Sequence, residues 1–175
     1  ASLGVFWNNK ELLKDYADNL EQVKPNGMIL GYPVINLRDS ISDMDFGLTK
    51  DVEIEDIDFG QIHPNIKREM IFFRDKDSGA YHVDFEKAMN AYIFGGEYTD
   101  EQEDFCSLQN QVTSKTPPAF MWHASGDGLI FPSNSIDFAR KLYENSVPYE
   151  LHIYQGGGHG VSLANYITGN DEYNL

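Results

Sequence analysis

The stretch that decides the fold, residues 116–164, reads TPPAFMWHASGDGLIFPSNSIDFARKLYENSVPYELHIYQGGGHGVSLA. Two short apolar runs in it, 119–123 and 149–154, are typical of buried β-strands. Between them, Ser133 or Asn134 begins a segment predicted to be a helix, because its apolar residues recur at helical spacing. The residues expected to face the core are Ile136, Ala139, Leu142 and Tyr143. Strand, helix and strand in this order indicate a parallel strand pair with a helix packed on it.

The upstream sequence adds a third strand and further helices. The uninterrupted apolar run MILGY at 28–32 predicts a strand that is buried on both faces. Predicted helices cover about 10–21 after the capping residue Asn8, about 85–94 between Asp84 and Gly95, and about 100–106 after Thr99 with Gln102. The fold class is therefore predicted as α/β, a mostly parallel sheet with helices on both faces.

Residues 36–83 interrupt this alternation. Acidic side chains crowd the range 39–58 between scattered aromatic residues. We interpret 36–83 as an inserted acidic loop or cap within one domain that spans 1–175, a length that suits a single core. Asp43 and Asp45 lack the further oxygen ligands of a calcium loop, so the acidic stretch is interpreted as a solvated face.

Charge and composition exclude several classes of partner. The chain has 13 basic and 28 acidic residues and a formal net charge of −15. This charge repels nucleic acid and anionic membrane surfaces, so neither is an expected partner. No window approaches the roughly 20 apolar residues that a membrane span needs. The single cysteine, Cys106, is typical of a reducing compartment, and a cytoplasmic protein is expected.

Two titratable residues follow the predicted strands of the 116–164 stretch. Asp127 lies in the turn after the strand at 119–123, and His159 lies in the glycine-rich turn after the strand at 149–154. In open parallel sheets, ligands bind beyond the carboxyl ends of the strands. A histidine that acts as a general base needs an orienting carboxylate on one ring nitrogen and a nucleophile on the other. We therefore predict Asp127 and His159 as a catalytic acid and base.

The same residues carry a family resemblance. The stretch 116–164 resembles the end of the acetyl esterase and lipase branch of the α/β-hydrolases, including acetyl-xylan-esterase-like members. GYPVIN at 31–36 and FGGEYTDEQEDFCSLQNQVT at 94–113 are also similar to that family. The resemblance implies an α/β-hydrolase fold in which Asp127, from the Asp-x-x-Ile pattern, is the triad acid and His159 the triad base.

The chain departs from this family at the nucleophile. No Gly-x-Ser-x-Gly elbow and no upstream His-Gly-Gly segment occur in the sequence. Since ASLGVFWN at 1–8 resembles the helix after such an elbow, we expect residue 1 to follow the serine by a few positions. The chain is then the C-terminal part of a hydrolase, its main partner is the N-terminal part of the same protein, and alone it is expected to be inactive. The strand at 28–32 would otherwise expose an apolar edge.

The resemblance implies hydrolysis of small carboxylic esters, with acetyl groups on sugars as the expected substrate class and no cofactor. Ile130 and Val161 adjoin the acid and the base and are candidates to line the acyl pocket. His123 is interpreted as a buried structural histidine, and His63, His82 and His152 have no metal-ligand spacing, so no metal site is predicted. The alternatives are a non-catalytic binding module of the same fold and a peptidase or lactone hydrolase. Homo-oligomerisation is left open.

Overall fold

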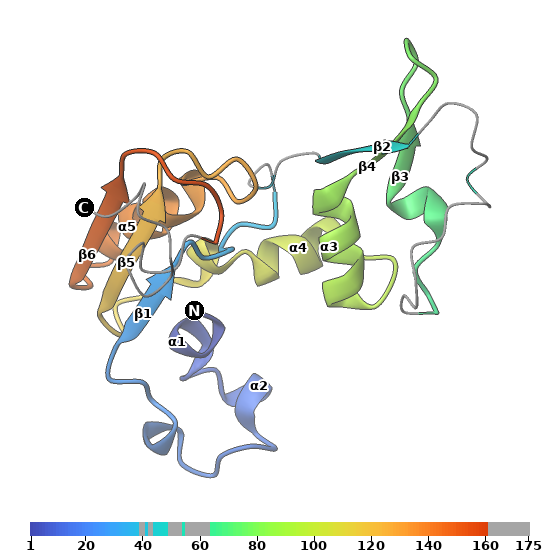
Figure 1. The fold of residues 1–175 in the computed structure, drawn as a ribbon. Helices are drawn as coiled ribbons and strands as arrows, with labels where there is room; N and C mark the ends of the chain where they lie inside the picture. The colour runs from blue at the N-terminus through green and yellow to red at the C-terminus, as the bar shows by residue number, and fades with distance from the viewer. Residues whose placement is uncertain (39–40, 42–43, 49–53, 55–63, 161–175) are drawn as a thin grey trace.

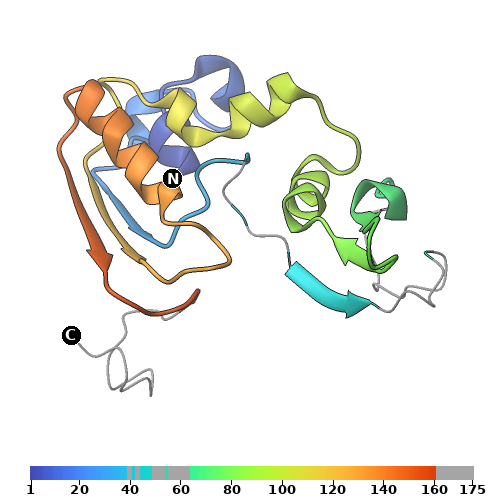
Figure 2. The same ribbon diagram turned by 90° about the horizontal axis from the view of Figure 1, so that it is seen from above.

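The computed structural model describes residues 1–38, 41, 44–48, 54 and 64–160, and Val161 therefore lies outside the described residues. Two sheets lie at opposite ends of the ribbon, with α3 (Phe85–Phe94) and α4 (Asp100–Cys106) between them (Figures 1 and 2). The parallel sheet consists of β1 (Met28–Gly31), β5 (Ala119–Ala124) and β6 (Tyr149–Tyr154). The second sheet consists of β2 (Met44–Leu48), β3 (Phe72–Arg74) and β4 (Tyr81–Val83).

The parallel sheet confirms the three strands predicted from the apolar runs. Its order is β1-β5-β6, so β5 is the central strand, and both pairs are parallel. Met28, Ala119 and Tyr149 are aligned across the three strands. Because β5 and β6 pair residue for residue up to Ala124 and Tyr154, they end at the same level. The turns that follow them therefore begin side by side.

The hydrophobic core lies against one face of the parallel sheet. It is covered by α1 (Ser2–Phe6), α5 (Ser133–Glu144) and the 3₁₀ turn Leu108–Gln111, and Figure 2 shows α1 and α5 on the same side of this sheet. The buried residues that form it are Val5, Met28, Ile35, Leu108, Val112, Ala119, Met121, Phe138, Ala139, Leu142 and Val147. Helix α5 is the connection between β5 and β6, as predicted.

The opposite face of this sheet corrects the prediction that the strand at 28–32 is buried on both sides. Ile29 is 78% exposed, and its cross-strand neighbour Phe120 is 39% exposed. The physical reason is that helices of the described part of the chain cover only the face that carries Met28 and Met121. An apolar run alone cannot distinguish a strand with one covered face from a strand with two.

Helix α5 has the predicted extent, but it turns a different face to the core. Its buried residues are Asn134, Ser135, Phe138, Ala139 and Leu142, whereas Ile136 and Tyr143 are exposed. Pro132 occupies the N-cap position without a side-chain hydrogen bond. Asn134 instead accepts hydrogen bonds from the backbone N–H groups of Ile35 and Asn36, at 2.8 and 2.9 Å. Asn134, which was predicted as a possible helix cap, therefore binds the loop after β1 instead.

The N-terminal region departs further from prediction. The expected helix over 10–21 is only α2 (Lys10–Leu13), followed by a 3₁₀ turn at Leu20–Gln22. Asn9, rather than Asn8, caps α2 by accepting from the N–H groups of Glu11 and Leu12. No residue of α2 is buried. A helix in a protein is stabilised mainly by packing of its apolar face. The apolar residues at helical spacing in 10–21 have no such packing in α2, so the helix is shorter than predicted.

Two helices between the sheets confirm the capping predictions. α3 (Phe85–Phe94) begins after Asp84, which accepts from Lys87 N, and ends at Gly95 in the left-handed region with φ 73°. α4 (Asp100–Cys106) begins with a reciprocal capping box between Thr99 and Gln102. The buried residues of α3 are Asn90 and Ala91, whereas Tyr92 is exposed.

The described residues within 36–83 include the antiparallel sheet, with the order β2-β4-β3. Phe72 pairs with Val83 and Arg74 with Tyr81, and a 3₁₀ turn at Arg68–Met70 precedes β3. Ile71 and Phe72 form a second small core with Ala91 of α3. No helix in the described part of the chain has both the length and the apolar character that crossing a bilayer requires.

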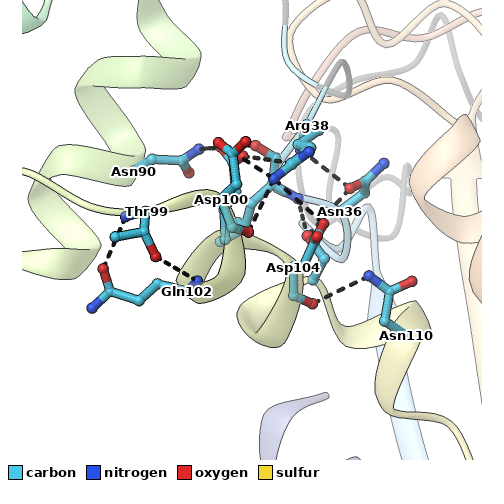
Figure 3. A network of polar contacts seen from close by, with 11 residues as sticks. Asn36, Arg38, Asn90, Thr99, Asp100, Gln102, Asp104 and Asn110 are labelled. Carbon is cyan, nitrogen blue, oxygen red and sulfur yellow. Dashed lines mark hydrogen bonds and ion pairs between the residues drawn. The ribbon is translucent and has the colours of Figure 1, made fainter.

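A polar network connects the loop after β1 to α3 and α4. Arg38 Nε lies 2.5 Å from the buried carboxylate of Glu103, and Asn90 donates from Nδ2 to Glu103 Oε1 at 2.7 Å and to the carbonyl of Leu37 at 2.8 Å. Figure 3 shows Arg38 close to Asp100 and Asp104 of α4. The network therefore satisfies a carboxylate that would be costly to bury alone.

We expect Asn90→Ala to lower the free energy of unfolding by about 1–3 kcal/mol, because it leaves two buried acceptors without their shared donor. Urea denaturation measures this as a lower midpoint at unchanged slope. Asn110→Ala is the matched control, because its side chain is exposed and donates to the carbonyl of Asp104; its expected change is about 0.5 kcal/mol or less. Equal midpoints for the two variants would contradict the role given to Asn90.

Candidate active site

Asp127 lies in the turn that follows β5, and its carboxylate is fixed by the backbone of the same turn. The residue is only 3% exposed. Its Oδ1 atom accepts hydrogen bonds from the N–H groups of Leu129 at 3.1 Å and Ile130 at 3.0 Å. This short-range arrangement is common for an aspartate in a turn. It leaves the second oxygen, Oδ2, to partners outside the turn.

His159 lies in the glycine-rich turn after β6 and reaches this second oxygen. Its Nδ1 atom is 2.9 Å from Asp127 Oδ2. Because a carboxylate only accepts hydrogen bonds, Nδ1 carries the proton and Nε2 is the basic nitrogen of the ring. The side chain of His159 is 34% exposed, in contrast to the fully buried carboxylate. The structure thus brings together the two residues that the sequence singled out, although they are 32 positions apart.

The two turns are held against each other by backbone contacts. Gly156 N–H donates to Ser125 Oγ at 3.1 Å, and Ser125 N–H donates to the carbonyl of Tyr154 at 2.8 Å. A Cβ atom at Gly126 would lie 2.6 Å from the carbonyl oxygen of Gly157. The acid turn therefore approaches the base turn more closely than any side chain at position 126 allows. This explains a glycine directly before the acid.

The environment of Asp127 favours its charged form. Burial raises the pKa of this carboxyl, but the hydrogen bonds from His159, Ile130 N–H and Leu129 N–H outweigh burial. The pKa is therefore held below its ordinary value of 3.8. A carboxylate that stays ionised can stabilise positive charge on the His159 ring.

Two further residues contact the pair and were not assigned to the site from sequence. His123 is fully buried on β5, with its Nε2 atom 3.2 Å from Asp127 Oδ2. Tyr32, directly after β1, places its ring edge-on to His159, with ring centroids 5.3 Å apart. Tyr32 also has a φ of 35°, which is unusual for a residue other than glycine. Their positions in the sequence could have indicated this. His123 is in the predicted strand at 119–123 and Tyr32 ends the predicted strand at 28–32, and ligands bind beyond the carboxyl ends of such strands.

The residues proposed to line the acyl pocket are placed only in part. Ile130 is 3% exposed, and its backbone N–H and carbonyl contact Asp127 and His123 respectively. A role for its side chain in acyl binding stays a prediction. Within residues 1–38, 41, 44–48, 54 and 64–160, no three His, Cys, Asp or Glu side chains group as a metal site would require.

Taken together, these positions suit proton transfer. The acid is buried and ionised, the base is held by one ring nitrogen, and the other ring nitrogen is on a partly exposed side chain. An imidazole held in this way can accept a proton from a hydroxyl group and return it to a leaving group.

The chain is similar to known proteins in sequence and in fold. The sequence profile described as prolyl oligopeptidase family matches residues 77–173. A 73-residue segment is 36% identical to endo-1,4-beta-xylanase B of Butyrivibrio fibrisolvens, covering 42% of this chain and 12% of that protein.

Solved structures extend the similarity to nearly the whole chain. An acetyl ester-xyloside bifunctional hydrolase from Caldicellulosiruptor lactoaceticus superposes with a TM-score of 0.57 at 25% identity, over 99% of this chain and 48% of that one. A carboxylesterase from Lactobacillus plantarum superposes with a TM-score of 0.55 at 23% identity, over 99% of this chain and 46% of that one. The fold is thus that of the α/β-hydrolases. The chain spans about half the length of these two structures.

We expect Gly126→Ala to separate the two turns, because its Cβ would meet the Gly157 carbonyl. The free energy of unfolding should fall by about 1–3 kcal/mol. The downfield proton resonance of His159 Nδ1–H should weaken in the ¹H NMR spectrum. Gly128→Ala is the matched control, because a Cβ there meets nothing within 4 Å. An unchanged resonance in Gly126→Ala would show that the turns do not depend on this close approach.

The lowered pKa of Asp127 predicts a pH-dependent contribution to stability. A carboxyl whose pKa is lower in the folded state stabilises the fold above its ordinary value of 3.8, and the contribution is lost as pH falls through the folded value. Wild type should therefore exceed Asp127→Asn in unfolding free energy near neutral pH, and the difference should shrink below 3.8. Urea unfolding of both proteins across this range tests the sign. A difference that grows on acidification would contradict it.

Proposed function

Because the chain belongs to the prolyl oligopeptidase family and has the α/β-hydrolase fold, we propose that it supplies the acid and the base of a serine-type carboxylic ester hydrolase. The observation that carries the proposal is the 2.9 Å contact between His159 Nδ1 and Asp127 Oδ2. It directs the basic Nε2 atom away from the acid, on a side chain that is partly exposed.

The proposed mechanism assigns one role to each residue of the pair. His159 Nε2 takes the proton of a serine hydroxyl as the serine attacks the ester carbonyl, and then gives this proton to the leaving alcohol. Water cleaves the acyl-serine in a second step, again with His159 as the base. Asp127 holds the imidazole tautomer and stabilises the imidazolium. The serine itself is proposed to come from a part of the protein outside these 175 residues.

The proposed substrates are small acyl esters, with acetyl groups on sugars as the first class to test. Support comes from the names of two similar proteins, an acetyl ester-xyloside bifunctional hydrolase and an endo-1,4-beta-xylanase. Both names refer to xylose-containing substrates. The second match covers a small part of the xylanase, so it supports the substrate class more weakly.

A second candidate is peptide hydrolysis by the same acid and base. The name of the matched family favours it, because members of a prolyl oligopeptidase family are named for cleaving peptides. The two candidates share the serine, the base and the acid, and they differ in the leaving group, an alcohol or an amine. Comparing acetylated xylo-oligosaccharides with proline-containing peptide amides separates them.

We expect His159→Ala and Asp127→Asn, each in the protein that includes the nucleophile, to lower kcat on p-nitrophenyl acetate by about a thousandfold or more. The matched control is His152→Ala, because His152 lies on β6 and contacts Glu150 rather than Asp127. Its activity should remain near that of wild type.

Labelling with a fluorophosphonate tests the serine separately from the substrate. A labelled serine and loss of turnover in His159→Ala support a serine hydrolase. Full esterase activity in His159→Ala contradicts the assignment of the base. Absence of labelling in a full-length, folded protein favours the alternative of a binding module.

A further inference from the structure

His123 is fully buried, and both of its ring nitrogens contact polar groups. It lies on the face of β5 that also carries Met121, and both are fully buried. A buried polar group costs free energy unless it is hydrogen-bonded. Leucine or methionine would fill such a position without this cost. The histidine therefore requires an explanation beyond packing.

The contacts of His123 determine its tautomer. Its Nε2 atom lies 2.9 Å from the carbonyl oxygen of Ile130 and 3.2 Å from Asp127 Oδ2. Both are acceptors, so Nε2 must carry a proton. Its Nδ1 atom lies 2.9 Å from the hydroxyl of Ser135, which is also fully buried. The Ser135 hydroxyl can donate to Nδ1, and the ring then points its Nε2–H at the Ile130 carbonyl in the acid turn.

His123 therefore holds the acid turn by a hydrogen bond to the Ile130 carbonyl, and its Nε2 atom also lies close to the catalytic carboxylate. Oδ1 is held by two backbone N–H groups of its own turn. Oδ2 lies between His159 Nδ1 at 2.9 Å and His123 Nε2 at 3.2 Å. With His123 absent, rotation of the carboxylate about its last bond would be limited by the turn and by His159 alone. His123 thus adds a fixed contact from the rigid central strand.

We propose that His123 is a positioning residue for the acid, with Ser135 fixing its tautomer, so that the carboxylate of Asp127 keeps the orientation that His159 requires. The proposal rests on the function proposed above. His123 acts through Asp127 rather than on substrate, because it is fully buried while His159 is partly exposed. It also links the helix α5, through Ser135, to the acid turn.

The test compares three variants in the full-length enzyme with p-nitrophenyl acetate as substrate. His123→Leu keeps the volume and removes the donor, His123→Gln can place an amide N–H near the position of Nε2, and Ser135→Ala removes the group that fixes the tautomer. We expect kcat to fall roughly 10- to 100-fold in His123→Leu, the range for leaving a buried acceptor, here the Ile130 carbonyl, without its donor. KM should stay within about twofold of wild type. His123→Gln should recover most of the lost kcat, and Ser135→Ala should lose less than His123→Leu.

A second measurement does not depend on any variant folding. Long-range ¹H–¹⁵N NMR spectra of wild-type enzyme should report the His123 ring as protonated at Nε2 and not at Nδ1. An Nδ1–H ring would overturn the proposal, as would wild-type kcat in His123→Leu. A loss of kcat that His123→Gln does not recover, in variants with equal melting temperatures, would also overturn it.

The outcome for His159→Ala separates this proposal from the function on which it rests. If His159→Ala is inactive and His123→Leu retains wild-type kcat, the hydrolase stands and the positioning role falls. If His159→Ala keeps full activity, the proposed function itself falls, whatever the His123 variants show.

Discussion

The parallel pairing of β5 with β6 is the constraint on which the candidate site depends. The two strands are aligned from Ala119 and Tyr149 to Ala124 and Tyr154, so their last residues lie side by side. The turn after each strand carries one member of the pair. Strand pairing alone leaves several ångströms between neighbouring chains, and the closer approach comes from Gly126, which packs against the Gly157 carbonyl. Together they place the acid and the base at hydrogen-bonding distance.

A buried carboxylate imposes the second requirement. Asp127 is ionised in a site that excludes most water, and such a charge is stable only when its oxygens are hydrogen-bonded. Its own turn satisfies one oxygen and two histidines lie against the other. The pKa of Asp127 is lowered by the hydrogen bonds from His159 and from the N–H groups of Ile130 and Leu129, which outweigh the effect of burial. The same contacts that make burial tolerable also orient the carboxylate, so stability and the geometry of the candidate site have a common origin here.

The loop after β1 connects this site to the rest of the chain. Its backbone N–H groups are bound by Asn134 of α5, and the carbonyl of Leu37 is bound by Asn90 of α3. Tyr32, at the start of the loop, contacts His159. The described residues of the antiparallel sheet pack on α3 through Ala91. One loop therefore links the base, the helix that follows the acid and the second sheet.

The sequence by itself determined the elements whose signals are local. The apolar runs at 119–123 and 149–154 predicted the strands β5 and β6. The caps Asp84, Gly95 and Thr99 predicted ends of two helices, because each cap acts within one turn of backbone. Asp127 and His159 could be chosen for the same reason, since both follow predicted strands at an edge where ligands bind.

Only the tertiary structure decided which faces are covered and which side chains meet. The helical periodicity places Ile136 and Tyr143 on one face of α5, but the position of the sheet decides that this face is exposed. The helix expected over 10–21 is only α2 in the structure, because none of the residues of α2 is buried against another element. Likewise His123 and Tyr32 contact the pair through strand neighbours that are distant along the chain. Such contacts depend on register and packing, which no local pattern in the sequence encodes.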